Sequence, residues 1–297
     1  MKKHYSLRSI FVLTAMLLVL QACSDSSQTP SLSTTPNQGA STPAAVEADN
    51  NSETSADDSD MPKIEWDTVT LKNDSGKTMI RSVSAPYGKH LSFAIVSSKG
   101  TVVIADPNNI PYPKGHLKAD AITTTFINHD HRDEKFLLYN PDARVSEMKA
   151  ESFTVKDIQI TGIPASHDGQ PVDPENPTDV IYLYEVDGLR IAYFAGVDQQ
   201  ELTADQLKQL GRIDIALVSF FDSPVWHVKK EVSILILKAL SPRIVLPTEL
   251  KDEVAEEIKK AANLTDGGSS ESLTISPADL AAMKGTTSIF LEPIKMS

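Results

Sequence analysis

The chain has 297 residues, and its 40 acidic side chains outnumber 28 Lys and Arg side chains, which gives a formal net charge of -12. This balance argues against nucleic acid as a partner and against electrostatic adhesion to anionic lipid, because both attract cationic surfaces. The single cysteine, Cys23, excludes an internal disulfide, so the globular part must rely on its core or on a metal.

Residues 1–22 have the pattern of a secretory signal peptide. Basic side chains precede an apolar run, Ile10 to Leu20, that is too short to span a bilayer. The next residues, Leu20-Gln21-Ala22-Cys23, resemble the lipobox of bacterial lipoproteins, in which the cysteine is lipidated and becomes the first residue. A buried or a reactive thiol is the alternative for Cys23. We expect a lipid anchor there, and Ser24 implies sorting to the bacterial outer membrane, with the domain in the periplasm or at the cell surface.

Residues 23–61 are expected to form a lipidated, disordered tether. Residues 24–61 contain no aromatic residue and no Lys or Arg, and Ser, Thr, Pro, Asn and acidic residues dominate. Such a composition cannot bury enough apolar surface to offset the entropy of ordering. The globular domain is therefore expected to span residues 62–297, enough for one sizeable core.

Apolar periodicity in this domain predicts strands first and alternating helices and strands later. The predicted strands are Thr68–Leu71, Met79–Ser84, His90–Ser97, Thr101–Ala105, Ala121–Asn128, Ser152–Val155, Ile158–Ile163, Val180–Val186, Leu189–Ala195, Ile213–Phe220 and Arg243–Leu246. The predicted helices are Glu134–Leu138, Ala204–Leu210, Val228–Leu240 and Lys251–Ala262, and Gly267-Gly268 is interpreted as a turn. Two β-rich halves with helices outside predict an α/β fold in which two packed sheets are covered on both faces.

The densest group of chemically capable side chains follows the predicted strand Ala121–Asn128. It reads His129-Asp130-His131-Arg132-Asp133-Glu134. Two histidines at i and i+2 beyond a strand end can share a metal ion, and a carboxylate at i+4 can reach a neighbouring ion. An exposed loop with two histidines is the alternative that this segment alone leaves open.

This segment resembles the H-x-H-x-D-H motif of the metallo-β-lactamase superfamily, and further landmarks occur in the same order along the domain. They are Gly88-Lys89-His90 with Val103 to Pro107, Pro164-Ala165-Ser166-His167, Gly188 to Asp198, and Ile213 to Leu217 with Pro242 to Pro247. The last two strands are similar to the ascorbate-6-phosphate lactonase-like branch. The resemblance implies a four-layer αββα sandwich with a metal site.

The chain departs from the motif at three places. Glu134 replaces the last histidine of H-x-H-x-D-H, Glu249 replaces the terminal histidine, and Asp198 comes one residue late, which a register step or a bulge would accommodate. The resemblance therefore implies one intact metal site, His129, His131 and His167, for which a zinc ion is expected. The neighbouring site becomes four carboxylates: Asp133, Glu134, Asp198 and Glu249.

Carboxylate ligands suit harder ions than zinc, so the second ion is either one such as Mn or absent. If it is absent, Asp133 or Glu134 is expected to act as the catalytic proton acceptor. Alternatively, the imidazoles are protonated and paired with the acids in an inactive relic of the site.

Four other side chains have weaker assignments. His90 lines the pocket or is a strand-end histidine satisfied by hydrogen bonds, and Asp106 is expected to hydrogen-bond to the histidine segment. His116 is expected to be exposed. His227 is a candidate for substrate binding, with a role beside Trp226 at a helix start as the alternative.

These features lead to a first hypothesis of a metal-dependent hydrolase. Its substrate would be a small ester, lactone or phosphoester, with metal-activated water as the nucleophile. The alternative is a catalytically inactive binding or scaffold lipoprotein on the same fold, and a third hypothesis, a structural role in the envelope, rests on the anchor and tether alone. The sequence specifies no protein partner.

Overall fold

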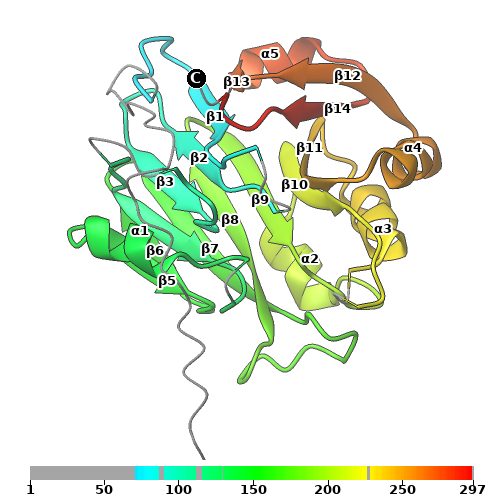
Figure 1. Cartoon of the computed structure of the whole chain (residues 1–297). Helices are drawn as coiled ribbons and strands as arrows, with labels where there is room; N and C mark the ends of the chain where they lie inside the picture. Colours follow the sequence, from blue (N-terminus) through cyan, green and yellow to red (C-terminus); the bar gives the residue numbers. More distant parts are fainter. Residues whose placement is uncertain (1–70, 87–89, 112–115, 129, 226–227, 296–297) are drawn as a thin grey trace, which may run out of the picture. The chain divides into compact units, whose positions relative to one another are not determined.

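The computed structural model of the chain describes residues 71–86, 90–111, 116–128, 130–225 and 228–295 (Figure 1). All of them belong to one compact unit, Ser55–Ser297. The predicted signal peptide, Cys23, the tether, His129 and His227 lie outside the described residues. Within the described part of the chain, no helix is long and apolar enough to cross a membrane.

The first sheet has six strands in the order β13-β1-β2-β3-β4-β5. They are β1 (Thr78–Ser82), β2 (Phe93–Val96), β3 (Val102–Ala105), β4 (Ala121–Thr124), β5 (Arg144–Glu147) and β13 (Ser272–Ile275). The pairs from β13 to β3 are antiparallel, whereas β3, β4 and β5 run parallel. The carboxyl ends of β3 and β4 therefore lie at the same edge of this sheet.

The second sheet has eight strands in the order β12-β14-β11-β10-β9-β8-β7-β6. They are β6 (Ser152–Val155), β7 (Ile158–Ala165), β8 (Asp179–Val186), β9 (Leu189–Ala195), β10 (Ile215–Phe220), β11 (Ile244–Leu250), β12 (Leu264–Ser270) and β14 (Thr286–Leu291). Strands β6 to β9 pair antiparallel, and β9, β10, β11, β14 and β12 pair in parallel. The carboxyl ends of β7, β9, β10 and β11 consequently share one edge.

Helices cover the outer faces of the two sheets (Figure 1). They are α1 (Glu134–Tyr139), α2 (Ala204–Leu210), α3 (Lys230–Leu240) and α4 (Asp252–Ala261), whereas α5 (Pro277–Ala282) contributes Leu280 to the core between the sheets. One core lies between the sheets and includes Phe93, Tyr184 and Leu217. A second core joins the eight-stranded sheet to α2, α3 and α4, and a third covers the six-stranded sheet with Phe136 of α1. The expected four-layer αββα sandwich is confirmed.

Two helix starts follow directly from local sequence. The Thr203 side chain accepts a hydrogen bond from the Gln206 backbone, and the Gln206 side chain accepts one from the Thr203 backbone. Ser276 and Asp279 form the same reciprocal pair at α5, where Pro277 suits the first turn. These capping boxes fix the first turns of α2 and α5.

The structure differs in two ways from the helices and strands that the sequence predicts. It adds β5, β12, β13, α5 and β14. Gly267 and Gly268 lie within β12, whose exposed, polar sequence has no alternating pattern, so parallel pairing with β14 rather than propensity makes it a strand. The strand predicted to reach Asn128 ends at Thr124, because the Thr125 amide donates to the Asp106 side chain instead.

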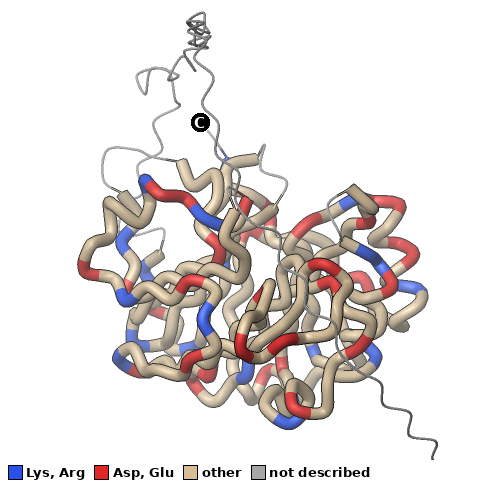
Figure 2. The backbone as a smooth tube through the Cα atoms, turned by 90° about the horizontal axis from the view of Figure 1, so that it is seen from below, with Lys and Arg blue, Asp and Glu red and all other residues tan. Residues whose placement is uncertain are grey.

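Acidic and basic residues are interspersed along the described backbone (Figure 2). In this view the basic residues do not gather on one face. Nucleic acid and anionic membranes attract a protein electrostatically when its basic side chains cluster on one face.

Candidate metal centre

Asp106 and His131 form the centre of a buried polar network. Asp106 follows β3 with a φ of 45°, and its Oδ1 accepts a hydrogen bond of 2.7 Å from the Thr125 amide. Its Oδ2 lies 2.7 Å from both the Thr125 hydroxyl and Nδ1 of His131. A carboxylate at that position holds the imidazole proton on Nδ1 and leaves the lone pair on Nε2. The predicted hydrogen bond between Asp106 and the histidine segment is confirmed.

His90 lies beside His131 in the same network, with ring centroids 4.2 Å apart. Its Nε2 is 2.8 Å from the Tyr193 hydroxyl and 3.4 Å from Asp106 Oδ2, while its Nδ1 is 4.0 Å from Glu249 Oε1. The side chain is buried, so the prediction of a histidine satisfied by hydrogen bonds is confirmed. Among the described residues, His90, Asp106 and His131 are the one group of three or more with ligand atoms close enough to hold a metal ion.

Electrostatic interactions shift the pKa values of Asp106 and His90 in opposite directions. Burial alone would raise the pKa of Asp106, but the charges and hydrogen bonds of His131 and His90 hold that pKa far below its usual range. Burial alone would lower the pKa of His90, but the hydrogen bond to Asp106 and the charges of Glu249, Asp106 and Asp130 raise it overall. Both shifts favour the charged forms of Asp106 and His90.

We expect the stability of the metal-free chain to fall as the pH rises above 6.5, the ordinary pKa of histidine. Because the folded-state pKa of His90 is raised, its contribution is fully present below the unfolded-state pKa and is lost as the pH rises through the folded-state pKa. Urea unfolding of chelator-treated protein between about pH 6 and about pH 9 measures this slope.

The matched variants for this measurement are His90→Gln and His116→Gln. His116 is exposed and stacks on Tyr139, so its variant should keep the slope that His90→Gln reduces. Equal slopes in the two variants would contradict the assignment to His90.

His167 follows β7 on the other side of the Phe126 ring. Phe126 stacks on His167 with centroids 4.3 Å apart and presents an edge-on contact to His131 at 6.0 Å. Nδ1 of His167 lies 2.6 Å from the Gly196 carbonyl oxygen, which again places the proton on Nδ1 and the lone pair on Nε2. A methyl group at Gly196 would lie 2.9 Å from that Nδ1, so this approach requires glycine.

Asp179 is a buried carboxyl group beside His167 that the sequence did not single out. Its Oδ2 lies 3.7 Å from Nδ1 of His167 and has no hydrogen-bond partner. Burial and the charge of Asp106 raise the pKa of Asp179 well above its ordinary value. The neutral form of the carboxyl group is therefore favoured.

The four carboxylates predicted to surround a second ion have separate partners. Asp133 caps α1 by accepting hydrogen bonds from two backbone amides, and Glu134 is 81% exposed and pairs with Arg132. Asp198 forms an ion pair with Lys229, and Glu249 accepts a hydrogen bond from the Ser219 hydroxyl. The described side chains therefore do not form the expected four-carboxylate cluster, because helix capping and local ion pairs direct each group elsewhere.

The late position of Asp198 coincides with an irregularity at the end of β9. Leu217 of β10 pairs with Tyr193, but the next residue, Val218, pairs with Ala195, so the register shifts by one. Ala195 also has a φ of 40°. The extra residue before Asp198 is thus accompanied by the register step that the sequence predicted.

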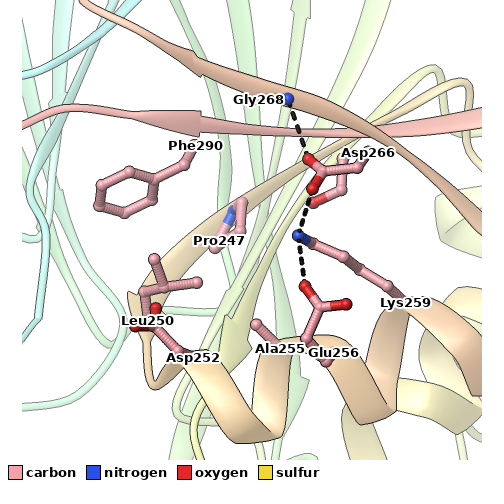
Figure 3. Close-up of a pocket in the computed structure, with 10 residues that line it drawn as sticks. Pro247, Leu250, Asp252, Ala255, Glu256, Lys259, Asp266, Gly268 and Phe290 are labelled. Carbon is pink, nitrogen blue, oxygen red and sulfur yellow. Dashed lines mark hydrogen bonds and ion pairs between the residues drawn. The ribbon is translucent and has the colours of Figure 1, made fainter.

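A separate cavity of about 140 Å³ lies between α4 and strands β11, β12 and β14 (Figure 3). Lys259 bridges Glu256 at 3.1 Å and Asp266 at 2.9 Å across it, and the Gly268 amide donates to Asp266. None of the predicted site residues lines this cavity. It is distinct from the histidine network.

Comparison with known proteins assigns the chain to a family. A family model described as a beta-lactamase superfamily domain matches residues 86–249, which is more than half of the chain. This match includes all the histidines of the network and all four carboxylates. No curated protein matches the sequence with significance.

Structural comparison finds solved proteins of low sequence identity to this chain. A candidate Zn-dependent hydrolase of the metallo-β-lactamase superfamily from Thermotoga maritima is 17% identical, with a TM-score of 0.49 over 73% of this chain and 100% of its own. A candidate metal-dependent hydrolase from Parabacteroides distasonis is 20% identical, with a TM-score of 0.48 over 75% of this chain and 97% of its own. The extent of the family match decides the assignment: this chain belongs to the metallo-β-lactamase superfamily.

Proposed function

We propose that the chain is a metal-dependent hydrolase of a small ester, lactone or phosphoester. The observation that carries the proposal is the orientation of two histidines. Nδ1 of His131 is held by Asp106, and Nδ1 of His167 is held by the Gly196 carbonyl. Metal-ligating histidines are oriented by such partners, a carboxylate or a backbone carbonyl. His129, two positions before His131, is the third proposed ligand.

A zinc ion or a similar divalent ion held by these histidines would supply a Lewis acid and an activated water molecule. The protein's own contribution is orientation and proton control. Asp106 and Gly196 fix the protonated nitrogen of each ligand, and the Phe126 ring covers one face of His167. Of the four predicted carboxylates, Glu249 is the one within ion-pair distance of the described network, with Oε1 4.0 Å from Nδ1 of His90.

The size of a neighbouring cavity supports a small substrate. A cavity of about 320 Å³ is lined by the segment that follows His167 and by the segment that follows Asp198, including Gly169, Gln170 and Gln199. Small-molecule sites usually have volumes of about 300–1,000 Å³. The likeness of the last strands to the lactonase-like branch is the reason for including lactones.

Metal analysis and hydrolysis assays of the purified full chain test the proposal. After expression with added zinc, we expect about one equivalent of metal in the wild type and less than about 0.2 equivalents in His167→Ala. Hydrolysis of chromogenic ester, lactone and phosphoester probes should fall with the metal content. His116→Ala, which removes an exposed histidine, is the control and should match the wild type.

A wild-type chain with less than about 0.2 equivalents of metal would contradict the proposal. The second candidate function, a catalytically inactive binding or scaffold lipoprotein, is favoured by the separate partners of the four carboxylates. It predicts a folded chain that cleaves none of the probes. In either case we propose attachment to the outer membrane through Cys23, which the lipobox-like segment supports.

A further inference from the structure

The ammonium group of Lys229 contacts both oxygens of Asp198. Its Nζ lies 3.0 Å from Oδ1 and 2.8 Å from Oδ2. The Asp198 side chain is 1% exposed, whereas that of Lys229 is 52% exposed, so the cation reaches inward from the surface. A buried carboxylate requires such a partner, because an unpaired charge in the interior is strongly unfavourable.

Both members of this pair are fixed beside His167. The Asp198 amide donates to the Ser166 carbonyl at 2.8 Å, and the Asp198 carbonyl accepts from the Gly169 amide at 2.7 Å. The backbone of Asp198 is thus tied to the residues on both sides of His167. Val228 pairs with Ser223 through two backbone hydrogen bonds, which fixes the chain immediately before Lys229.

While Lys229 pairs with Asp198, the other three predicted carboxylates have partners of their own. Asp133 is engaged by the first amides of α1, and Glu134 lies in solvent with Arg132. Glu249 accepts a hydrogen bond of 2.6 Å from Ser219. A second divalent cation at Asp198 would also lie next to the ammonium group, and like charges in a poorly solvated site repel strongly.

From these contacts we infer that Lys229 takes the place of a second metal ion. Its ammonium group neutralises Asp198, and the centre holds a single ion on the histidine side. This inference rests on the proposed function. It assigns Lys229 as a positioning residue that keeps Asp198 and the His167 loop in place without a second metal.

Metal stoichiometry of the full chain tests this role independently of activity. Titration with Zn²⁺ and with Mn²⁺, followed by metal analysis, should give about one ion per wild-type chain. Lys229→Met removes the charge but keeps an unbranched side chain, so a second ion should bind and raise the total to about two. Lys229→Arg keeps the cation and should stay at about one.

Two further variants make the result specific. Lys230→Met changes the adjacent lysine, which pairs with Glu257 and not with Asp198, and should leave the stoichiometry unchanged. Lys229→Met combined with Asp198→Asn should lose the second ion, because Asp198 is its ligand. This double variant also removes the unpaired buried charge, so it tests folding if Lys229→Met alone is unstable.

The outcomes separate this inference from the proposed function. Two ions in the wild type, or one ion in both the wild type and a folded Lys229→Met, would overturn the inference and leave a metal-dependent function intact. One ion in the wild type and two in Lys229→Met, with no hydrolysis of the probes by either chain, would support the inference and contradict the proposed function. No metal in either chain would overturn both.

Discussion

We expect Asp106→Asn to weaken metal binding by about 10- to 100-fold, the usual cost of losing the partner that orients a ligating histidine. The asparagine oxygen can still accept from the Thr125 amide, but its nitrogen donates where the aspartate oxygen accepts from His131. To pair with that donor, His131 must carry its proton on Nε2. The lone pair required for a metal is then lost from Nε2, although the side chain keeps its size.

The same substitution removes the anion of a buried network. Asp106 is fully buried and also faces His90, so we expect the free energy of unfolding of the metal-free chain to fall by about 3–5 kcal/mol. Calorimetric zinc titration measures the affinity, and urea unfolding measures the stability.

Asp120→Asn is the matched control for this experiment. Asp120 precedes β4, accepts a hydrogen bond from the Val102 amide and pairs with Lys156, and neither contact involves a histidine. It should leave zinc affinity unchanged. Wild-type affinity in Asp106→Asn would show that His131 does not depend on this carboxylate for metal binding.

We expect Gly196→Ala to cause a similar loss of metal affinity, about 10- to 100-fold, by displacing His167. The added methyl group would lie 2.9 Å from Nδ1 and 3.0 Å from Cε1 of the imidazole, closer than carbon atoms normally approach. Gly196 does not have a positive φ, so its backbone accepts alanine and the effect comes from the contact alone. The imidazole must move away, and its hydrogen bond to the Gly196 carbonyl lengthens.

Ala195→Gly, at the last residue of β9, controls for general loosening at the end of this strand. It removes a methyl group at a residue with a φ of 40°, a conformation that glycine accepts readily. Zinc affinity should change by less than about twofold, since no atom is added near His167. If the two variants lose affinity equally, loop disorder rather than the contact with His167 is the cause.

The strand-end location of the site could be read from the sequence. Apolar runs that stop at Asp106, at His167 and before Asp198 are local patterns, and parallel strands bring such ends to one edge. The hydrogen bond between Asp106 and the histidine segment followed from the same reasoning. The capping role of Asp133 also had a local signal, because an aspartate directly precedes the helical segment Glu134–Tyr139, but the motif spacing favoured a ligand role.

The sequence by itself determined the acidic balance, the order of the central strands along the chain and the strand-end positions of Asp106 and His167. Only the tertiary structure decided which partner each carboxylate takes. Lys229 meets Asp198 across 31 positions, and β13 pairs with β1 through Ile275 and Thr78 at opposite ends of the domain. Such pairings depend on how distant loops and edges pack, whereas periodicity and capping act within a few residues.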